Sequence, residues 1–327
     1  MKELNAVETW YKELQFESLE EFLEFSSLNT PAHKGYIDFN QMIFRGHSHA
    51  NSYKLTPNAL RLRDGNLPVL KFHPAFAVIK SKKATINQVI EAEYCSLLQF
   101  YKTSNFNGLY TPGEEIFKDE YFLNVFDYTY KNIYEWYPSE IEELAAIAQH
   151  FGFLTRLLDW TFDFRVALYF ALQEVNKIAN CDKEENEDFY AIWCVNAGAI
   201  QAMRNEEFNN SEPPPCPIKF FVPSYSHNIN LRAQSGLMSY SKAYYQNTHK
   251  IYQAETQDKT ILDYIRLIDR EYRNHHNDGV LMCKILIPTV NAKKEFCWLT
   301  EQGYHAAKLF PGYEGVVRKI DEDQWLS

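Results

Sequence analysis

The chain has 327 residues, enough for one large domain or two small ones. Hydrophobic residues make up 46% and aromatic residues 16% of the sequence, which excludes intrinsic disorder over most of its length. The 33 basic and 43 acidic residues give a net charge of −10. This charge argues against a broad nucleic-acid-binding surface, although it leaves room for a local basic groove.

The six cysteines, at positions 95, 181, 194, 216, 283 and 297, include no C-x-x-C pair. They predict reduced, buried thiols, and we expect neither a disulfide framework nor a metal site. The chain starts with a polar, acidic segment rather than an apolar signal region. It contains no apolar run near the ~18–20 residues that a membrane span requires. We therefore expect a cytoplasmic protein with no membrane partner.

The first 27 residues predict two short amphipathic helices. Asn5 and Glu8 fit a capping box, and Ser18 and Glu21 fit a second one. We interpret residues 1–40 as an N-terminal helical cap and residues 41–327 as the remaining domain.

Further along the chain, helical and strand patterns alternate irregularly. Apolar spacing and end signals predict helices over 85–106, 121–137, 139–152, 163–172, 258–275 and 293–302. Continuous apolar runs predict strands over 42–44, 189–195, 218–222 and 280–287. Residues 155–160 read as a connector and 212–217 as a proline-rich loop. The helix after Asp163 is apolar on nearly every side, so we expect it to be buried at the centre.

Together these elements lack βαβ regularity and internal repeats. They predict one α+β domain with a short, mostly antiparallel sheet core, a buried central helix and an N-terminal helical cap.

The sequence carries no phosphate loop, dinucleotide fingerprint or hydrolase motif. Polar residues inside apolar segments are the alternative signal, and the first is Arg45, which continues an apolar strand and precedes Gly46. A glycine there lets another backbone or a ligand approach closely, and a guanidinium suits a phosphate. Pairing of Arg45 with a structural carboxylate is the competing interpretation.

The second signal lies between residues 148 and 161, where four polar residues interrupt a stretch apolar enough for a core: Gln149, His150, Arg156 and Asp159. Because buried charges are tolerated chiefly in pairs, we expect Arg156 to bond Asp159 or another acid. The set forms either a ligand site or a structural ion pair. His150 is a candidate base, a ligand contact or a satisfied histidine at a helix end.

Two later segments have the same character. Arg232 and Gln234 precede a turn at Gly236, and Glu314 lies between Gly312 and Gly315 on a tight turn or at a helix start. A helix N-terminus favours a carboxylate without any catalytic role, so Glu314 is either a cap or a functional acid.

In this order the four segments resemble the FRG domain family. The resemblance rests on Phe44-Arg45-Gly46, Leu55-x-Pro57-x-x-Leu60-Arg61, the segment 148–161 with 166–171, Arg232-x-x-x-Gly236, and Leu309-Phe310-Pro311-x-x-Glu314-Gly315. It extends from about residue 43 to 320. The family has been placed near the ADP-ribosyltransferase superfamily, and bacterial members look like parts of phage-defence or toxin systems.

That resemblance implies NAD as a substrate and a role for each residue. Arg45 would hold the NAD pyrophosphate by charge-assisted hydrogen bonds. Glu314 would stabilise the ribosyl cation as nicotinamide leaves. Arg156 and Asp159, with Gln149 and His150 nearby, would orient a ribose or support the site, and Arg232 and Gln234 would complete the nucleotide contacts.

Three functions remain open from the sequence. One is an NAD-consuming, ADP-ribosyltransferase-like enzyme, whose acceptor is water, a protein, a nucleic acid or a small molecule. Another is a non-catalytic sensor or regulatory module that binds a nucleotide or phosphate ligand. The third is a hydrolase in which His150 is the base and Asp159 orients it. The sequence specifies neither the oligomeric state nor a protein partner.

Overall fold

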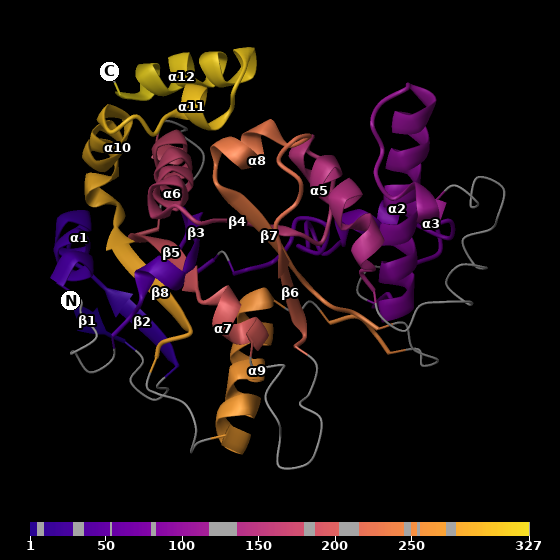
Figure 1. Ribbon diagram of the computed structural model, residues 1–327, viewed down its shortest axis with the longest axis horizontal. Helices are drawn as coiled ribbons and strands as arrows, with labels where there is room; N and C mark the ends of the chain where they lie inside the picture. Colours follow the sequence, from indigo (N-terminus) through magenta and orange to yellow (C-terminus); the bar gives the residue numbers. More distant parts are fainter. Residues whose placement is uncertain are drawn as a thin grey trace.

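Eight strands form one sheet at the centre of the computed structural model (Figure 1), which describes residues 1–4, 10–28, 36–52, 54–79, 83–117, 136–179, 187–202, 216–244, 250–253, 256–272 and 279–326. The strand order is β1-β2-β8-β5-β3-β4-β7-β6. Neighbouring strands are antiparallel except β2 and β8, which are parallel. The bounds are β1 Lys2–Glu3, β2 Tyr11–Gln15, β3 Ile43–His47, β4 Leu158–Thr161, β5 Phe189–Val195, β6 Ile218–Phe221, β7 Gly236–Ser241 and β8 Met282–Pro288.

Helices of very different length surround this sheet. The α-helices are α1 Leu19–Leu28, α2 Ile86–Phe106, α3 Glu114–Phe117, α5 Glu142–His150, α6 Phe164–Ala179, α7 Ala197–Ala202, α8 Ile229–Ala233, α9 Gln257–Tyr272, α10 Ala292–Glu301, α11 Ala306–Leu309 and α12 Tyr313–Leu326. Short 3-10 helices lie at Phe39–Gln41, Pro68–Phe72, Ser139–Ile141 and Thr289–Asn291. None of the helices in these ranges is both long and apolar enough to cross a bilayer.

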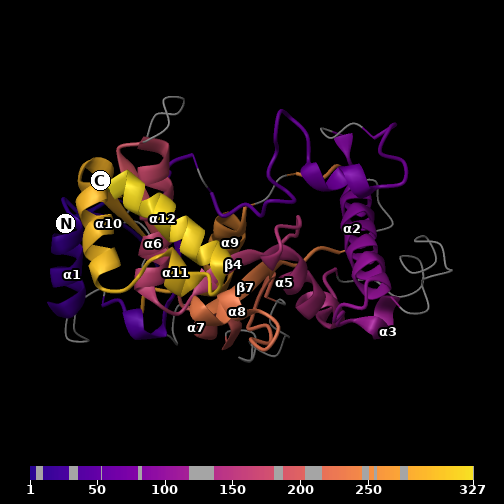
Figure 2. The same cartoon turned by 90° about the horizontal axis from the view of Figure 1, so that it is seen from above.

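The helices make two layers over the sheet and a flank beside it. On one face α6, α10 and α1 pack on the strands and share the largest apolar core with α11. On the other face α7 and α9 cover a second core, and Figure 1 shows these two helices below the sheet. At the side, α2 and α5 enclose a third core with β7, and Figure 2 shows α2 standing apart from the two layers. The α+β class and the mostly antiparallel sheet are therefore confirmed, with a central helix in α6.

The N-terminal prediction of two helices is half wrong. Ser18 caps α1 as expected, since its hydroxyl accepts the Glu21 N–H at 3.1 Å. The first helix, however, is replaced from Tyr11 to Gln15 by β2, which pairs with β8 along all five residues. An isolated helix of this length is marginal in water. The open backbone edge of β8 offers a full ladder of hydrogen bonds instead, so residues 11–15 join the sheet. The proposed boundary at residue 40 stays a prediction.

Most of the other elements match the sequence patterns, and the exceptions are short or depend on distant partners. The expected connector at 155–160 is partly wrong, because Leu158–Thr161 forms β4 between β3 and β7. The helix expected over 139–152 begins with the short 3-10 helix Ser139–Ile141, and α5 itself begins at Glu142. Most of the expected helix 121–137 and of the loop 212–217 lies outside the described residues. β7 and α12 have no counterpart in the prediction.

Gly46 fixes the distance between β3 and α6. The strand expected to stop at this glycine runs on to His47. A Cβ atom on residue 46 would lie 1.9 Å from the carbonyl oxygen of Ala167, in the second turn of α6. Only glycine lets the two backbones approach this closely.

We expect Gly46→Ala to lower the free energy of unfolding by about 3 kcal/mol or more, at the upper end of what overpacking costs, because the clash is with backbone and no rotamer relieves it. Gly198→Ala is the matched control. Its Cβ would meet nothing closer than 3.8 Å, and the residue is helical, so its stability should stay level or rise. Urea unfolding measures both, and equal stability of the two variants would contradict this account of Gly46.

Candidate functional site

A cavity of about 560 Å³ lies where β3 and β4 separate. The two strands pair in register only at Phe44 and Thr161. Beyond this pair, side chains from β3, β4, α6, α8, α12 and the end of α5 line the space between them. The predicted site residues among the lining residues are Arg45, Gln149, His150, Asp159, Gln234 and Glu314. Residues more than 260 positions apart in the sequence therefore face one cavity.

Arg45 leaves β3 toward β4. Its Nε–H donates to Nε2 of His47 at 3.0 Å, its Nη1 donates to the carbonyl of Asp159, and Nη1 lies 3.8 Å from a carboxylate oxygen of Asp159. Burial lowers the pKa of Arg45, the carboxylate of Asp159 raises it, and Arg61 lowers it. Arg45 stays charged because a guanidinium pKa is far above neutrality. A largely buried cation beside a second cation is a good site for an anionic group of a ligand.

Asp159 is held from its other side by α5. The side-chain amide of Gln149 donates to Asp159 Oδ1 at 2.6 Å, and the amide oxygen of Gln149 accepts from the Thr155 hydroxyl. This chain of hydrogen bonds fixes the orientation of both the amide and the carboxylate. The Asp159 side chain keeps 54% of its surface exposed, so it faces solvent or a ligand rather than the core.

His150 and Glu314 come from opposite ends of the domain and interact through the cavity. Burial lowers the pKa of His150 below its ordinary value of 6.5, while the charges of Glu314 and Asp159 act in the opposite direction. His150 is therefore neutral at pH 7 and able to accept a proton. Glu314 lies in the first turn of α12, where Arg318 donates to Oε1 from Nε at 3.1 Å and from Nη2 at 2.6 Å.

Gln234 has a positioning role in this arrangement. Its side-chain amide donates to the carbonyl of Leu309 at 3.0 Å, and its backbone carbonyl accepts from the Thr161 hydroxyl at 2.7 Å. One residue thus joins the end of α8 to both β4 and α11. It fixes the wall of the cavity that lies between Asp159 and Glu314.

Arg156 lies behind the site, in a buried ion pair that we call the frame. Of its expected partners, Asp159 or another acid, the structure shows another acid, Glu93. The Nε–H of Arg156 donates to both carboxylate oxygens of Glu93, at 2.9 and 3.0 Å, and its Nη1 donates to the carbonyl of Ser241 at 2.9 Å. The Trp136 indole also donates to Glu93, at 2.9 Å. Both charged side chains are at least 96% buried. Although burial alone lowers the pKa of Arg156, the Glu93 carboxylate raises it above its usual value.

Arg232 also lies away from the cavity. It is exposed in the last turn of α8 and is not among the lining residues. Arg232 contributes to this turn through its backbone. Its N–H donates to the carbonyl of Asn228, and its carbonyl accepts from the N–H of Ser235.

Several lining residues were not singled out from the sequence. Phe170, Gln173, Glu174 and Lys177 follow i, i+3, i+4, i+7 spacing and bring one side of α6 to the cavity. The central helix is thus not buried on every side, and this stripe was visible in its sequence. Arg318 could have been recognised as the i+4 partner of Glu314, but only if α12 had been predicted.

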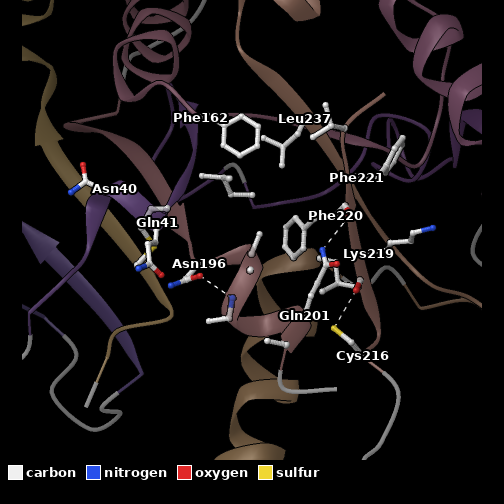
Figure 3. Close-up of a pocket in the computed structure, with 18 of the residues that line it drawn as sticks. Asn40, Gln41, Phe162, Asn196, Gln201, Cys216, Lys219, Phe220, Phe221 and Leu237 are labelled. Carbon is white, nitrogen blue, oxygen red and sulfur yellow. Dashed lines mark hydrogen bonds between the residues drawn. The ribbon is translucent and has the colours of Figure 1, made fainter. Parts of the chain in front are cut away.

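A second cavity, of about 1010 Å³, lies between α7, β6 and the start of β3 (Figure 3). Figure 3 shows Gln201 hydrogen-bonded to Phe220 and the Cys216 thiol directed to a backbone oxygen, at 3.2 Å and 3.1 Å respectively. Its lining contains none of the predicted site residues. One of its two lysines, Lys219, lies 2.6 Å from Glu142 in an ion pair. The lining of this second cavity consists mainly of apolar side chains and amides. The smaller cavity between β3 and β4, which is lined by charged residues, is therefore the candidate site.

We expect Arg156→Ala to lower the free energy of unfolding by about 3–5 kcal/mol, because Glu93 is left charged and buried without its partner. Asp159→Ala should change it by about 1 kcal/mol or less, since its contact with Arg45 is long and half exposed. Chemical denaturation of the two variants checks this difference. An equal loss of unfolding free energy in the two variants would show that Asp159 stabilises the fold as much as Arg156 does.

The midpoint of the His150 titration, followed by NMR, should lie below 6.5. Glu314→Gln should lower it further, because the substitution removes a negative charge that favours the imidazolium. Since the folded-state pKa is depressed, the stability that depends on neutral His150 is present above pH 6.5 and is lost as pH falls through the depressed value. An unchanged midpoint in Glu314→Gln would show that the two side chains do not share the cavity.

Comparison with known proteins gives one family. Residues 40–180, which include β3, α5, β4 and α6, match the family model of the FRG domain. No curated protein and no solved structure matches the chain.

Proposed function

We propose that this chain, which carries an FRG domain, is an NAD-cleaving, ADP-ribosyltransferase-like enzyme whose active site is the cavity between β3 and β4. The observation that carries the proposal is the meeting of Arg45 from β3 with Glu314 from α12, beside Asp159 and His150, in one cavity. A volume of about 560 Å³ is within the range of small-molecule and cofactor sites.

The phosphates of NAD bind at the Arg45 end of the cavity in this proposal. Arg45 uses Nε and Nη1 on His47 and Asp159, and within the described ranges its Nη2 has no hydrogen-bond partner. Arg61 and Lys177 line the same cavity and add positive charge. An anionic pyrophosphate offsets the unfavourable burial of these cations through charge-assisted hydrogen bonds.

The reaction requires a carboxylate near the sugar. When the bond between ribose C1′ and the nicotinamide nitrogen breaks, the electron pair stays with nicotinamide and the sugar carbon becomes positively charged. Glu314 is the proposed carboxylate that stabilises this charge. Neutral His150 takes the proton that the attacking acceptor releases, because its lowered pKa keeps it unprotonated at pH 7. Gln149 and Arg45 hold Asp159 as an orienting group beside them.

The acceptor is proposed to be water, a protein or a small molecule, because a net charge of −10 disfavours a nucleic acid. We propose a cytoplasmic, bacterial setting, in phage defence or a toxin system, on the strength of the family resemblance.

A second candidate function is a module that binds a nucleotide or phosphate ligand without cleaving it. The ion pair between Glu314 and Arg318 favours this alternative, since a carboxylate engaged by a guanidinium is a weaker stabiliser of a new cation. In this reading Arg45 still anchors the phosphate, and Arg318 becomes a further contact of the ligand.

Nicotinamide release from NAD by the purified chain tests the proposal. We expect release by the unmodified protein, a loss of about 10- to 100-fold in Arg45→Ala and a loss of at least about 100-fold in Glu314→Gln. Glu301→Gln, an exposed carboxylate on α10 away from the cavity, is the control and should behave as the unmodified chain.

The two functions give different results in the same experiment. Nicotinamide release that depends on both Arg45 and Glu314 supports the enzyme. No release, together with NAD-dependent thermal stabilisation that is lost in Arg45→Ala, overturns catalysis and supports the binding module. Neither release nor stabilisation overturns both.

A further inference from the structure

Asn228 is an amide without hydrogen bonds in the wall of the cavity. It lines the cavity, its side chain is fully buried, and neither its Oδ1 nor its Nδ2 has a hydrogen-bond partner among the described residues. Its backbone is satisfied, because its N–H donates to Tyr225 and its carbonyl accepts from Arg232. The lack of partners is therefore confined to the side chain.

Asn228 also does not perform the usual task of its position. It is the N-cap residue of α8, where an asparagine side chain normally accepts from a backbone N–H of the first turn. No such bond forms here. Leaving a buried amide unpaired costs about 1–3 kcal/mol, and a leucine of similar size would avoid this cost. The polar group thus serves neither the helix nor the core of the unliganded protein.

We propose that the Asn228 side chain forms a paired donor and acceptor contact with an amide or amidine edge on a ring of the bound ligand. This inference rests on the proposed function, in which that ligand is NAD. NAD presents such an edge twice, in the carboxamide of nicotinamide and in the amino and ring-nitrogen edge of adenine. Leu231 and Met238 line the cavity with Asn228 and offer apolar surface to the face of the ring.

The burial of Asn228 favours a role in selecting one ligand over another, beyond adding to its affinity. The amide is shielded from water, so a hydrogen bond made there is stronger than one at the surface, and a wrong partner is penalised more. Its sequence neighbours His227 and Ile229 are exposed. Because the Asn228 side chain has no exposed surface in the unliganded chain, the proposal requires this segment to move locally when the ring of the ligand binds.

Binding measured by calorimetry, with thermal melts of the same samples, tests the proposal. The probes are NAD, its nicotinic acid analogue, which has a carboxylate in place of the carboxamide, and its purine analogue, which has a hydrogen in place of the adenine amino group. We expect Asn228→Ala to weaken NAD binding about tenfold or more. Its melting temperature without ligand should not fall, because the unsatisfied amide is removed. A merely structural asparagine would lower it.

Asn291→Ala is the matched control. Asn291 is also an N-cap residue without a side-chain cap bond, at the start of α10, but it is exposed and lies away from the cavity. Its NAD affinity should equal that of the unmodified chain.

The analogues identify the edge that is read. If Asn228 reads the carboxamide, the unmodified chain prefers NAD to the nicotinic acid analogue and Asn228→Ala loses this preference. If it reads adenine, the lost preference is the one against the purine analogue. NAD binding that needs Arg45 but is equal in Asn228→Ala overturns the role of Asn228 and leaves the proposed function standing. No NAD binding by the unmodified chain overturns both.

Discussion

The close approach of α6 to Gly46 is the constraint on which the site depends. It places the start of α6 against β3, and this determines where the cavity-facing side of the helix lies. The same helix carries Tyr169, whose hydroxyl donates to the buried carboxylate of Glu322 in α12. Glu322 also accepts the Ala306 N–H at 3.1 Å and so joins α11 to α12. The backbone contact between Gly46 and α6 therefore helps to position both the β3 side of the cavity and, through Tyr169 and Glu322, its α12 side.

A second glycine completes the connection to Glu314. A Cβ on Gly315 would lie 1.9 Å from the carbonyl oxygen of Phe310, so the first turn of α12 packs directly on the preceding segment. Glu314 is consequently held beside Phe310 and not on a free turn. The close packing at Gly315 positions the Glu314 carboxylate, and Arg318 forms an ion pair with it. The charged frame of Arg156 and Glu93 lies behind this site and ties α2 to the ends of β4 and β7.

Local sequence patterns predicted what local interactions determine. The strand Phe189–Val195 was predicted at its observed bounds, and the long helix after Thr85 was predicted from its apolar spacing and its end signal, because those signals lie within the elements or directly beside them. Most of the polar residues that were singled out inside apolar segments line the cavity, since an unusual residue is visible without its partner. The family model of the FRG domain matches residues 40–180, which include Arg45, Gln149, His150 and Asp159.

What escaped prediction depends on distant residues. Tyr11–Gln15 reads as a helix until the edge of β8 is present, more than 260 residues later. Arg156 was expected to bond an acid, but Glu93 lies 63 positions away and no local pattern connects them. Asn228 was not singled out from the sequence. That its side chain lacks hydrogen-bond partners is visible only once the surrounding elements are in place.

The hydrogen bonds on β6 bear on how copies of this protein behave beside one another. β6 is the last strand in the sheet order, and strands in that position can recruit foreign strands through their unpaired backbone groups. Gln201 occupies the carbonyl of Phe220, and the Cys216 thiol faces that of Ile218. The opposite end is the two-residue β1. Two outward carbonyls of β6 are thus already engaged, and β1 offers a short edge, which disfavours pairing of either end of the sheet with another strand.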